Sequence, residues 1–158
     1  MLTALPGRHA VSRLFATPAF PAGSGPDFVN AAVAVETDLP PEAILALLHE
    51  IEAETGRERR ERWAARTLDL DLIALGDLMR PDRETLSHWI DLPLDQQMQQ
   101  TPDRLLLPHP RMQDRAFVLV PLSEVVPAGW RHPLTGHSVD EMLAALPEAE
   151  KVGVRPLE

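Results

Sequence analysis

The chain has 158 residues, of which 44% are hydrophobic, 25% are charged and 16 are prolines, while cysteine and tyrosine do not occur. Its length indicates one domain over residues 1–158 that can bury a core without disulfides or structural zinc. The net charge of −9 disfavours nucleic acid and anionic membranes as partners. The absence of cysteine excludes iron–sulfur clusters and thiol nucleophiles and is compatible with a cytoplasmic location. No apolar run approaches the roughly 20 residues of a membrane span.

Two strands are expected near the start of the chain. Residues 8–16 alternate between two faces, as a strand requires. Residues 28–36 alternate in the same way and place Phe28 and Asn30 on one face. An aromatic ring together with an amide is unusual on a strand face that packs into a hydrophobic core. The Pro- and Gly-rich residues 17–26 between the strands predict a loop.

A helix is expected next. Thr37 or Asp38 is the expected N-cap, and Gly56 is the expected stop. Between them, apolar residues recur at the spacing of one helix face, at Ile44, Leu47, Leu48 and Ile51. This stripe predicts that one side of the helix is buried.

The central part of the chain is less regular. Residues 67–75 predict a strand, since leucine alternates with aspartate before an apolar end. The polar residues 82–104 predict an irregular insertion rather than a second domain. Order is expected again over residues 105–110, and the apolar residues 116–126 predict a buried segment.

The final helix has the clearest local signals. Ser138 and Glu141 form the pattern of a capping box, and Pro147 marks the expected end. One apolar stripe lies between them, at Val139, Met142, Leu143 and Leu146. We therefore expect this helix to pack one face against the core.

Asp69 and Asp71 are the strongest candidates for chemistry. On a strand, residues two apart point the same way, so the two carboxylates would stand roughly 7 Å apart on one face. Two close carboxylates repel each other unless a cation or proton lies between them. With no cysteine in the chain, the matching cation is magnesium before zinc. The alternative is an ordinary half-exposed strand with its polar side outward.

An arginine cluster precedes this pair and comprises Arg57, Arg59, Arg60, Arg62 and Arg66. Guanidinium groups beside metal-binding carboxylates suit polyphosphate transfer. The alternative is a solvated helix end in which Glu58 and Glu61 are the ionic partners. No glycine-rich P-loop is present, and the single lysine is Lys151. Together, the carboxylates and arginines favour a nucleotide site.

A second group of residues is aromatic and polar: Thr17, Pro18, Phe28, Asn30, Trp63 and Phe117. Its aromatic rings could stack a flat heterocycle while Asn30 and the loop backbone read its edge. The alternative is that the aromatic residues belong to the core. His109 lies between two prolines, which cannot join a regular ladder. It is either a phosphate contact or a loop residue without a role.

Three segments closely resemble motifs of one family. They are Thr17-Pro with Pro26-Asp-Phe-Val-Asn-Ala-Ala, Arg62-Trp-Ala-Ala-Arg-Thr-Leu-Asp-Leu-Asp71, and Leu107-Pro-His-Pro-Arg-Met-Gln-Asp-Arg-Ala-Phe-Val-Leu-Val-Pro-Leu122. The family is 6-hydroxymethyl-7,8-dihydropterin pyrophosphokinase of folate biosynthesis. The resemblance implies an α+β, ferredoxin-like sandwich with an antiparallel-rich sheet and helices packed on it. It also implies transfer of a diphosphate from MgATP to the pterin hydroxymethyl group, with release of AMP.

The resemblance also implies roles for individual residues. Asp69 and Asp71 resemble the ligands of two magnesium ions, and Arg57, Arg59 and Arg66 resemble catalytic arginines. The residues that resemble ATP contacts are Glu52, Arg62, Arg66, His109 and Arg115. Those that resemble the pterin pocket are Thr17, Pro18, Phe20, Phe28, Asn30, Trp63 and Phe117. We expect a monomer that acts on small molecules.

The chain departs from the family pattern at two places. The family's Arg-Trp-Gly-Pro-Arg is here Arg62-Trp-Ala-Ala-Arg66, and the family's opening strand with its Gly-Ser-Asn turn is not found. The expectation is therefore that the first strand is missing, through a start codon set too far downstream or as a fragment with impaired activity. The alternative functions are a homologue that binds nucleotide or a partner without turnover and a magnesium-dependent phosphohydrolase.

Overall fold

The computed structural model describes residues 7–18, 27–57, 68–100, 102 and 104–157. The chain divides into two compact units. The first lies within Met1–His9 and Val35–Leu72, and the second within Ala10–Ala34 and Ile73–Glu158. Antiparallel strands with helices packed against them make the fold α+β, as predicted. None of the described helices is long and apolar enough to cross a bilayer.

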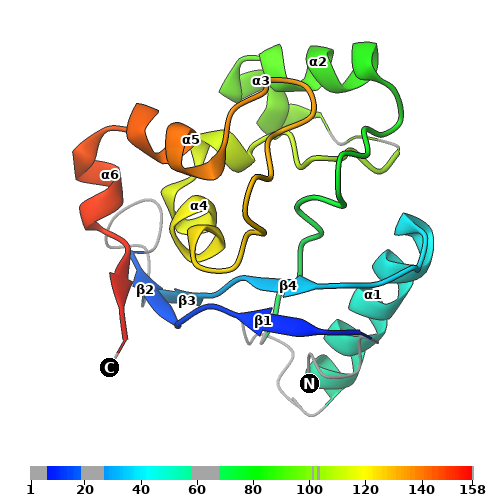
Figure 1. Ribbon diagram of the computed structural model, residues 1–158, viewed down its shortest axis with the longest axis horizontal. Helices are drawn as coiled ribbons and strands as arrows, with labels where there is room; N and C mark the ends of the chain where they lie inside the picture. Colours follow the sequence, from blue (N-terminus) through cyan, green and yellow to red (C-terminus); the bar gives the residue numbers. More distant parts are fainter. Residues whose placement is uncertain (1–6, 19–26, 58–67, 101, 103, 158) are drawn as a thin grey trace. The chain divides into compact units, whose positions relative to one another are not determined.

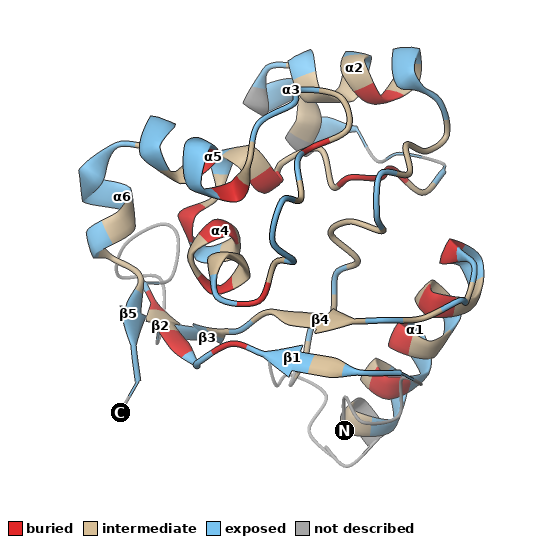
Figure 2. Ribbon diagram, viewed as in Figure 1, coloured by how far each residue is buried: buried red, intermediate tan, exposed pale blue. Residues whose placement is uncertain are grey.

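The first unit is built around helix α1 (Pro41–Arg57). Of the predicted stripe, Ile44, Leu48 and Ile51 are buried and Leu47 is partly buried, so the prediction of a buried side is confirmed. Buried residues of α1 are seen on part of its surface, and much of the rest is exposed (Figure 2). The predicted N-cap is wrong. The carbonyl of Pro40 accepts the first helical N–H groups, while the Thr37 hydroxyl accepts from the N–H of Leu39. The side chain of Thr37 thus makes a local turn before the helix and does not cap it.

Gly7 shows why this unit needs a glycine. Its φ of +112° lies in the region that disfavours a side chain, and a Cβ there would collide with the carbonyl oxygen of Glu36. The N–H of Glu36 donates to the carbonyl of Arg8 at 2.9 Å. The backbone segments that contain Gly7 and Glu36 therefore approach each other closely.

Each of the two long predicted strands is divided in the structure. Residues 8–16 give β1 (His9–Val11) and the start of β2 (Phe15–Thr17), and residues 28–36 give β3 (Phe28–Asn30) and β4 (Val33–Val35). Strand β1 pairs with β4.

The interruption has a side-chain cause at Ser12. The N–H of Ser12 donates to the carbonyl of Ala32, but the N–H of Ala32 donates to the Ser12 hydroxyl at 2.8 Å. A hydroxyl group therefore replaces a backbone acceptor, and the regular ladder stops. Alternating hydrophobicity cannot reveal this exchange.

Strand β2 is the centre of a three-stranded antiparallel sheet with the order β3-β2-β5 in the described part of the chain. Its register pairs Phe15 with Asn30 and Thr17 with Phe28. Strand β5 (Arg155–Pro156) lies on the other side of β2. Helix α4 (Ala116–Ser123) packs against β2 and β3 (Figure 1).

The core of the second unit lies between α4, the short helix η2 (Met112–Asp114) and α5 (Val139–Ala145). Its buried cluster consists of Met112, Leu119, Val139 and Met142. The buried segment predicted at residues 116–126 is confirmed in part: it contains α4, in which Ala116, Leu119 and Pro121 are buried, but Phe117 is 40% exposed. The cap of α5 is also confirmed, because the Ser138 hydroxyl accepts from the N–H of Glu141 at 3.1 Å. Helix α6 (Glu148–Val152) follows α5 and was not predicted.

Two predictions for the middle of the chain are wrong. The described part of the expected strand, residues 68–75, is not in a strand. A strand needs a ladder of hydrogen bonds to a neighbouring strand, and within the described part of the chain no strand pairs with residues 68–75. The carbonyl of Ile73 accepts from the N–H of His109, which lies in a loop. The leucines of this stretch are still more buried than the aspartates that alternate with them, although the stretch forms no β-ladder.

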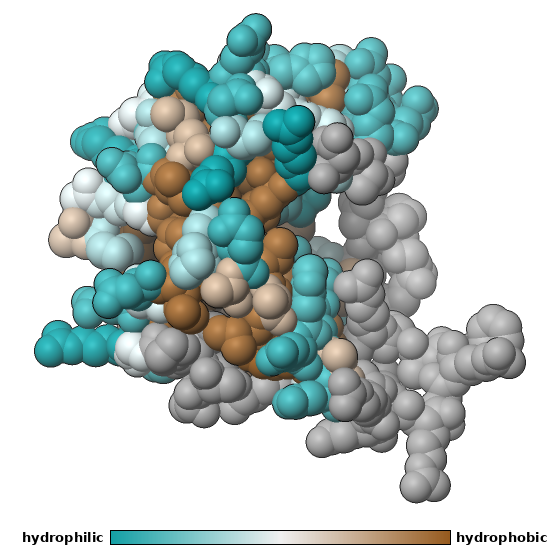
Figure 3. Space-filling view, turned by 90° about the vertical axis from the view of Figure 1, so that its right-hand side faces the viewer, coloured by the Kyte–Doolittle hydropathy of each residue, from teal (hydrophilic) through white to brown (hydrophobic). Residues whose placement is uncertain are grey.

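The insertion at residues 82–104 is not irregular, because it contains α2 (Arg83–Asp91) and α3 (Leu94–Gln99). Asp82 caps α2 by accepting from the N–H of Thr85 at 2.7 Å, and this bond is the main cause that lowers the pKa of Asp82. The surface where α2 and α3 lie is mainly hydrophilic (Figure 3). The polar composition of the insertion therefore gave no sign of its short helices, which bury few residues, Leu86 among them.

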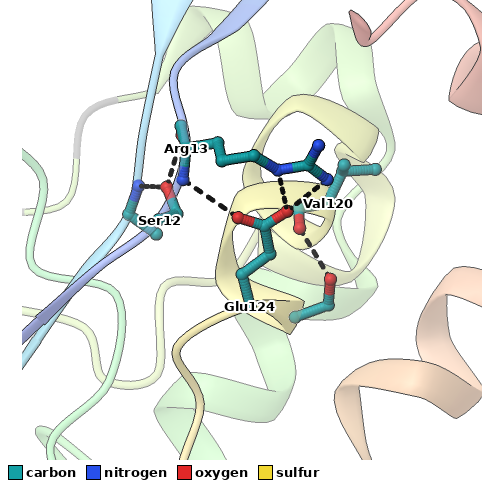
Figure 4. A network of polar contacts seen from close by, with 6 residues as sticks. Ser12, Arg13, Val120 and Glu124 are labelled. Atoms are coloured by element: carbon teal, nitrogen blue, oxygen red, sulfur yellow. Dashed lines mark hydrogen bonds and ion pairs between the residues drawn. The ribbon is translucent and has the colours of Figure 1, made fainter. Parts of the chain in front are cut away.

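An exposed ion pair ties the corner between β1 and β2 to the end of α4 (Figure 4). The guanidinium of Arg13 donates to one carboxylate oxygen of Glu124 at 2.7 and 2.9 Å. The backbone N–H of Arg13 donates to the other oxygen at 2.9 Å. These hydrogen bonds lower the pKa of Glu124 and raise the pKa of Arg13.

Candidate functional site

The candidate pterin residues on β2 and β3 lie on one face of the sheet. The register places Thr17 opposite Phe28, and Asn30 is diagonal to Thr17. The amide nitrogen Nδ2 of Asn30 donates to the Thr17 hydroxyl at 2.8 Å. Thr17 is buried, whereas Phe28 is 58% exposed. The arrangement therefore combines an oriented amide with an aromatic ring that is open to solvent.

Phe117 and Arg115 meet at the start of α4. The carbon of the Arg115 guanidinium lies 5.6 Å from the centroid of the Phe117 ring, within the range of a cation–π contact. Phe117 is 40% exposed, and α4 packs against β2 and β3. Pro18, at the end of β2, is exposed. The second unit thus contains five of the predicted pterin residues and two of the predicted ATP residues in its described part.

His109 is held in an ordered loop. Its N–H donates to the carbonyl of Ile73 at 2.7 Å, and its own carbonyl accepts from the N–H of Met112 at 3.2 Å. The ring nitrogen Nδ1 accepts from the N–H of Arg111 at 3.1 Å. When the ring is neutral, its hydrogen is therefore on Nε2. An N–H at that position can donate to an anionic oxygen.

Asp69 and Asp71 belong to the first unit, and both are exposed. Leu68, Leu70 and Leu72 alternate with them and are partly buried. The predicted sharing of a face is therefore visible in burial, although the strand itself is not formed. Glu52, a predicted ATP contact on α1, belongs to the same unit and is partly buried.

Asp69 and Asp71 fit a magnesium ion that is held partly by the protein and partly by the substrate. The described residues contain no group of three or more His, Cys, Asp or Glu side chains that could enclose a metal ion. Magnesium in phosphoryl-transfer sites is commonly held by one or two carboxylates together with substrate phosphates and water. Two exposed aspartates suit that mode of binding, in which the remaining ligands come from the substrate.

Several candidates lie outside the described residues, namely Phe20, Arg59, Arg62, Trp63 and Arg66. Arg57 is the last residue of α1, and the position of its side chain is not described. Their assigned roles stay predictions. The residues that are described fall into two groups, the carboxylates with Glu52 in one unit and the remainder in the other.

Arg111, which contacts the His109 ring, and Gln97, which contacts Arg111, are polar residues that the sequence did not single out. Nη1 of Arg111 donates to Oε1 of Gln97 at 3.0 Å. Arg111 lies inside the Leu-Pro-His-Pro-Arg-Met motif, so its place beside His109 was a usable signal. Gln97 is one of several glutamines on a polar stretch, and no local pattern separates it from the others.

The insertion also lines a surface pocket of about 220 Å³. Its lining residues are Pro81, Thr85, Trp89, Pro102, Arg104 and Leu106. None of these was predicted as a site residue, and the candidates described above do not line it. The predicted site residues of the described part of the chain therefore lie outside this pocket.

Comparison with known proteins identifies the family. The profile of the 7,8-dihydro-6-hydroxymethylpterin-pyrophosphokinase family matches residues 2–127. Three relatives named 2-amino-4-hydroxy-6-hydroxymethyldihydropteridine pyrophosphokinase are similar to this chain. The relative from Synechocystis sp. is 39% identical over 118 residues, which are 75% of this chain and 50% of that protein. The one from Pseudomonas aeruginosa is 39% identical over 87% of this chain and 72% of that protein.

The third relative, from Methylorubrum extorquens, is 35% identical over 147 residues, or 92% of this chain and 78% of that protein. The chain thus spans between half and about four fifths of the length of these relatives. Every predicted site residue, from Thr17 to Phe117, lies inside the range that the family profile matches. The chain therefore belongs to the 7,8-dihydro-6-hydroxymethylpterin-pyrophosphokinase family.

Proposed function

We propose that this chain transfers a diphosphate group from ATP to the hydroxymethyl group of 6-hydroxymethyl-7,8-dihydropterin in a magnesium-dependent reaction of folate biosynthesis. The observation that carries the proposal is the family match over residues 2–127, which includes all the candidate residues. The products are AMP and the pterin diphosphate.

The pterin is the proposed ligand of the face around Asn30. The amide of Asn30 is already oriented by its bond to the Thr17 hydroxyl, so its oxygen can accept from an N–H group of the heterocycle. Phe28 and Phe117 both have exposed ring surface that can stack a flat ring. Pro18, Phe20 and Trp63 are the further proposed members of this pocket.

The phosphates are the proposed ligands of His109 and the arginines. The neutral His109 ring donates from Nε2 to a phosphate oxygen. Arg115 carries a guanidinium that its contact with Phe117 orients, and guanidinium groups bind phosphate in a forked geometry. Further contacts to ATP or to the transferring phosphates are proposed for Glu52, Arg57, Arg59, Arg62 and Arg66.

Asp69 and Asp71 are the proposed protein ligands of two magnesium ions. Their exposure lets them bind ions that are also bound to substrate phosphates. When bound, magnesium would supply positive charge that neutralises the phosphate oxygens.

The proposed reaction is a direct transfer and needs no covalent intermediate on the protein. The hydroxymethyl oxygen forms a bond to the β-phosphorus of ATP as the bond between that phosphorus and the oxygen bridging to the α-phosphate breaks. AMP leaves with the electron pair of the broken bond, and the hydroxyl hydrogen leaves as a proton. Orientation of both substrates and neutralisation of charge do most of the catalytic work.

Calorimetry combined with product analysis tests the proposal. Mg·ATP is titrated into the protein, and AMP and phosphate are then measured with and without the pterin. AMP that forms only with the pterin is the expected result. Binding of Mg·ATP with no AMP would instead support a binding protein without turnover. Phosphate release that does not need the pterin would support a phosphohydrolase.

A further inference from the structure

A network of polar contacts joins the end of α4 to the corner between β1 and β2 (Figure 4). Its residues lie in the second unit, as do the described candidates for pterin binding. We propose that Glu124 is a positioning residue, which holds α4 and β2 in the alignment that brings Phe117 and the Asn30 amide to one pterin. The inference rests on the proposed function for the identity of this ligand.

Glu124 is attached firmly to α4. It directly follows Ser123, the last residue of the helix. Its N–H donates to the carbonyl of Pro121 at 3.1 Å, and the Ser123 hydroxyl donates to the carbonyl of Val120 at 2.7 Å in the same turn. Phe117 lies near the other end of α4, about 10 Å from Glu124 along the helix axis. The position of Glu124 therefore constrains that of Phe117.

Three hydrogen bonds from Arg13 converge on the Glu124 carboxylate. The backbone N–H of Arg13 donates to Oε1 at 2.9 Å, and its Nε and Nη2 donate to Oε2 at 2.9 and 2.7 Å. An exposed ion pair contributes little by itself. Here the backbone bond also fixes a main-chain atom of the strand corner to α4, and the paired guanidinium bonds restrain direction as well as distance.

Arg13 links this carboxylate to the candidate face of the sheet through Phe15. The carbon of the Arg13 guanidinium lies 5.5 Å from the centroid of the Phe15 ring, and Phe15 is buried on β2. In the register Phe15 is paired with Asn30, so the two side chains lie on one face of the sheet. Thr17 is on the same face and accepts from the Asn30 amide. Glu124 is thus linked to Asn30 through Arg13 and Phe15.

The strand corner is also held from the side of β3 and β4. The Ser12 hydroxyl donates to the carbonyl of Arg13 at 2.7 Å and accepts from the N–H of Ala32 at 2.8 Å. Both backbone polar groups of Arg13 are therefore bonded to side chains. Helix α4 packs against β2 and β3, but apolar packing has no direction of its own. The directional bonds of this network favour one alignment of helix and strands.

The test compares Glu124→Ala with Glu141→Ala in the full chain. Glu141 of α5 accepts from Arg131 at 2.7 Å in another exposed ion pair of the second unit, so its substitution controls for the loss of a surface carboxylate paired with arginine. Proton–nitrogen NMR without substrates reports the side-chain amide of Asn30, whose signal is assigned by its loss in Asn30→Leu. Steady-state kinetics give the KM values for the pterin and for ATP.

For Glu124→Ala we expect a shifted Asn30 amide signal and a KM for the pterin raised about 5-fold, with the KM for ATP within about 2-fold of wild type. Glu141→Ala should match wild type in all three measurements. Arg13→Met keeps the backbone N–H but removes the guanidinium over Phe15, so it should move the signal in the same direction. Because both residues act through one contact, the double variant should raise the KM for the pterin no further than Glu124→Ala alone.

The inference is overturned if the Asn30 signal keeps its wild-type position in folded Glu124→Ala. It is also overturned if the KM for the pterin is unchanged in that variant or if the KM for ATP rises equally. Should Glu124→Ala not fold, a wild-type Asn30 signal or a wild-type KM for the pterin in Arg13→Met would overturn it.

The NMR measurement needs no turnover and separates this inference from the proposed function. A protein that forms no pterin-dependent AMP, but whose Asn30 signal moves in Glu124→Ala and not in Glu141→Ala, would contradict the proposed function. It would leave the alignment of α4 with β2 by Glu124 supported.

Discussion

The polar candidates on β2 and β3 differ from the carboxylates of residues 68–72 in burial and in backbone structure. Asn30 donates to Thr17 within a paired ladder, and Thr17 is buried. Asp69 and Asp71 are exposed on a segment that forms no strand. The difference indicates that a strand ladder holds the surface proposed for the pterin, whereas the proposed metal ligands lie on an exposed, irregular segment that is accessible to ions and phosphates.

The largest effect is expected at the carboxylates. Asp71→Asn, and equally Asp69→Asn, should lower the rate of AMP formation at least about 100-fold, because each removes a ligand for the charge that neutralises the phosphates. Since both side chains are exposed, the free energy of unfolding should change by less than about 0.5 kcal/mol. Rates and urea unfolding curves measured on the same preparations give both values.

Asp77→Asn is the matched control, since Asp77 is an exposed aspartate in the turn after this segment. Its rate should stay within about 2-fold of wild type. Full activity in both Asp69→Asn and Asp71→Asn would show that the metal assignment is wrong.

The next effect concerns the support behind the sheet. Leu119 on α4 is fully buried in the core cluster, so Leu119→Ala should lower the free energy of unfolding by about 3 kcal/mol. Val152→Ala, at a valine that is 66% exposed, should cost less than about 0.5 kcal/mol. Equal losses in urea unfolding would contradict the burial assigned to α4.

Breaking the Asn30 contact tests organisation of the pterin face. Asn30→Leu should raise the KM for the pterin about 10-fold and leave the KM for ATP nearly unchanged, because it removes the amide that is proposed to form a hydrogen bond with the pterin. Thr17→Val removes the other partner of the bond. In a double-mutant cycle, the two changes should show a coupling of about 1 kcal/mol in the free energy of unfolding. Additive effects would mean that the bond does not organise this face.

The smallest effect is a pH dependence at Glu124. Its bonds to Arg13 hold its pKa below the ordinary value of 4.5, so the folded state binds its proton less readily than the unfolded state. The stabilisation is therefore complete above that pH and is lost as the pH falls through the lower folded pKa. Glu124→Gln should unfold with a weaker dependence on pH below 4.5. A thermal unfolding series identical to wild type would contradict this role.

The sequence predicted those features whose causes are local. Ile44, Leu48 and Ile51 define the buried face of α1 by spacing alone, and Ser138 caps α5 within three residues. The division of the strands could not be predicted because it depends on a bond between Ser12 and the distant Ala32.

Features of the candidate site were likewise predictable where their causes are local and unpredictable where they depend on distant residues. The motif around His109 was visible in the sequence, and the shared face of Phe28 and Asn30 followed from the two-residue period of a strand. The contact of Gln97 with Arg111 spans 14 residues between a helix and a loop, and no periodicity encodes it. Residues 67–75 were predicted as a strand from alternation, but residues 68–75, the described part, form none. Alternation reports burial, and a strand also needs a partner.

The most direct measurement follows the oxygen atom of the pterin. The protein is given Mg·ATP and 6-hydroxymethyl-7,8-dihydropterin labelled with ¹⁸O in the hydroxymethyl group, and the products are resolved by mass spectrometry. Equal amounts of AMP and pterin diphosphate are predicted, with the label retained in the pterin product and absent from AMP. ADP or phosphate in place of AMP, or AMP formed without the pterin, would contradict the account.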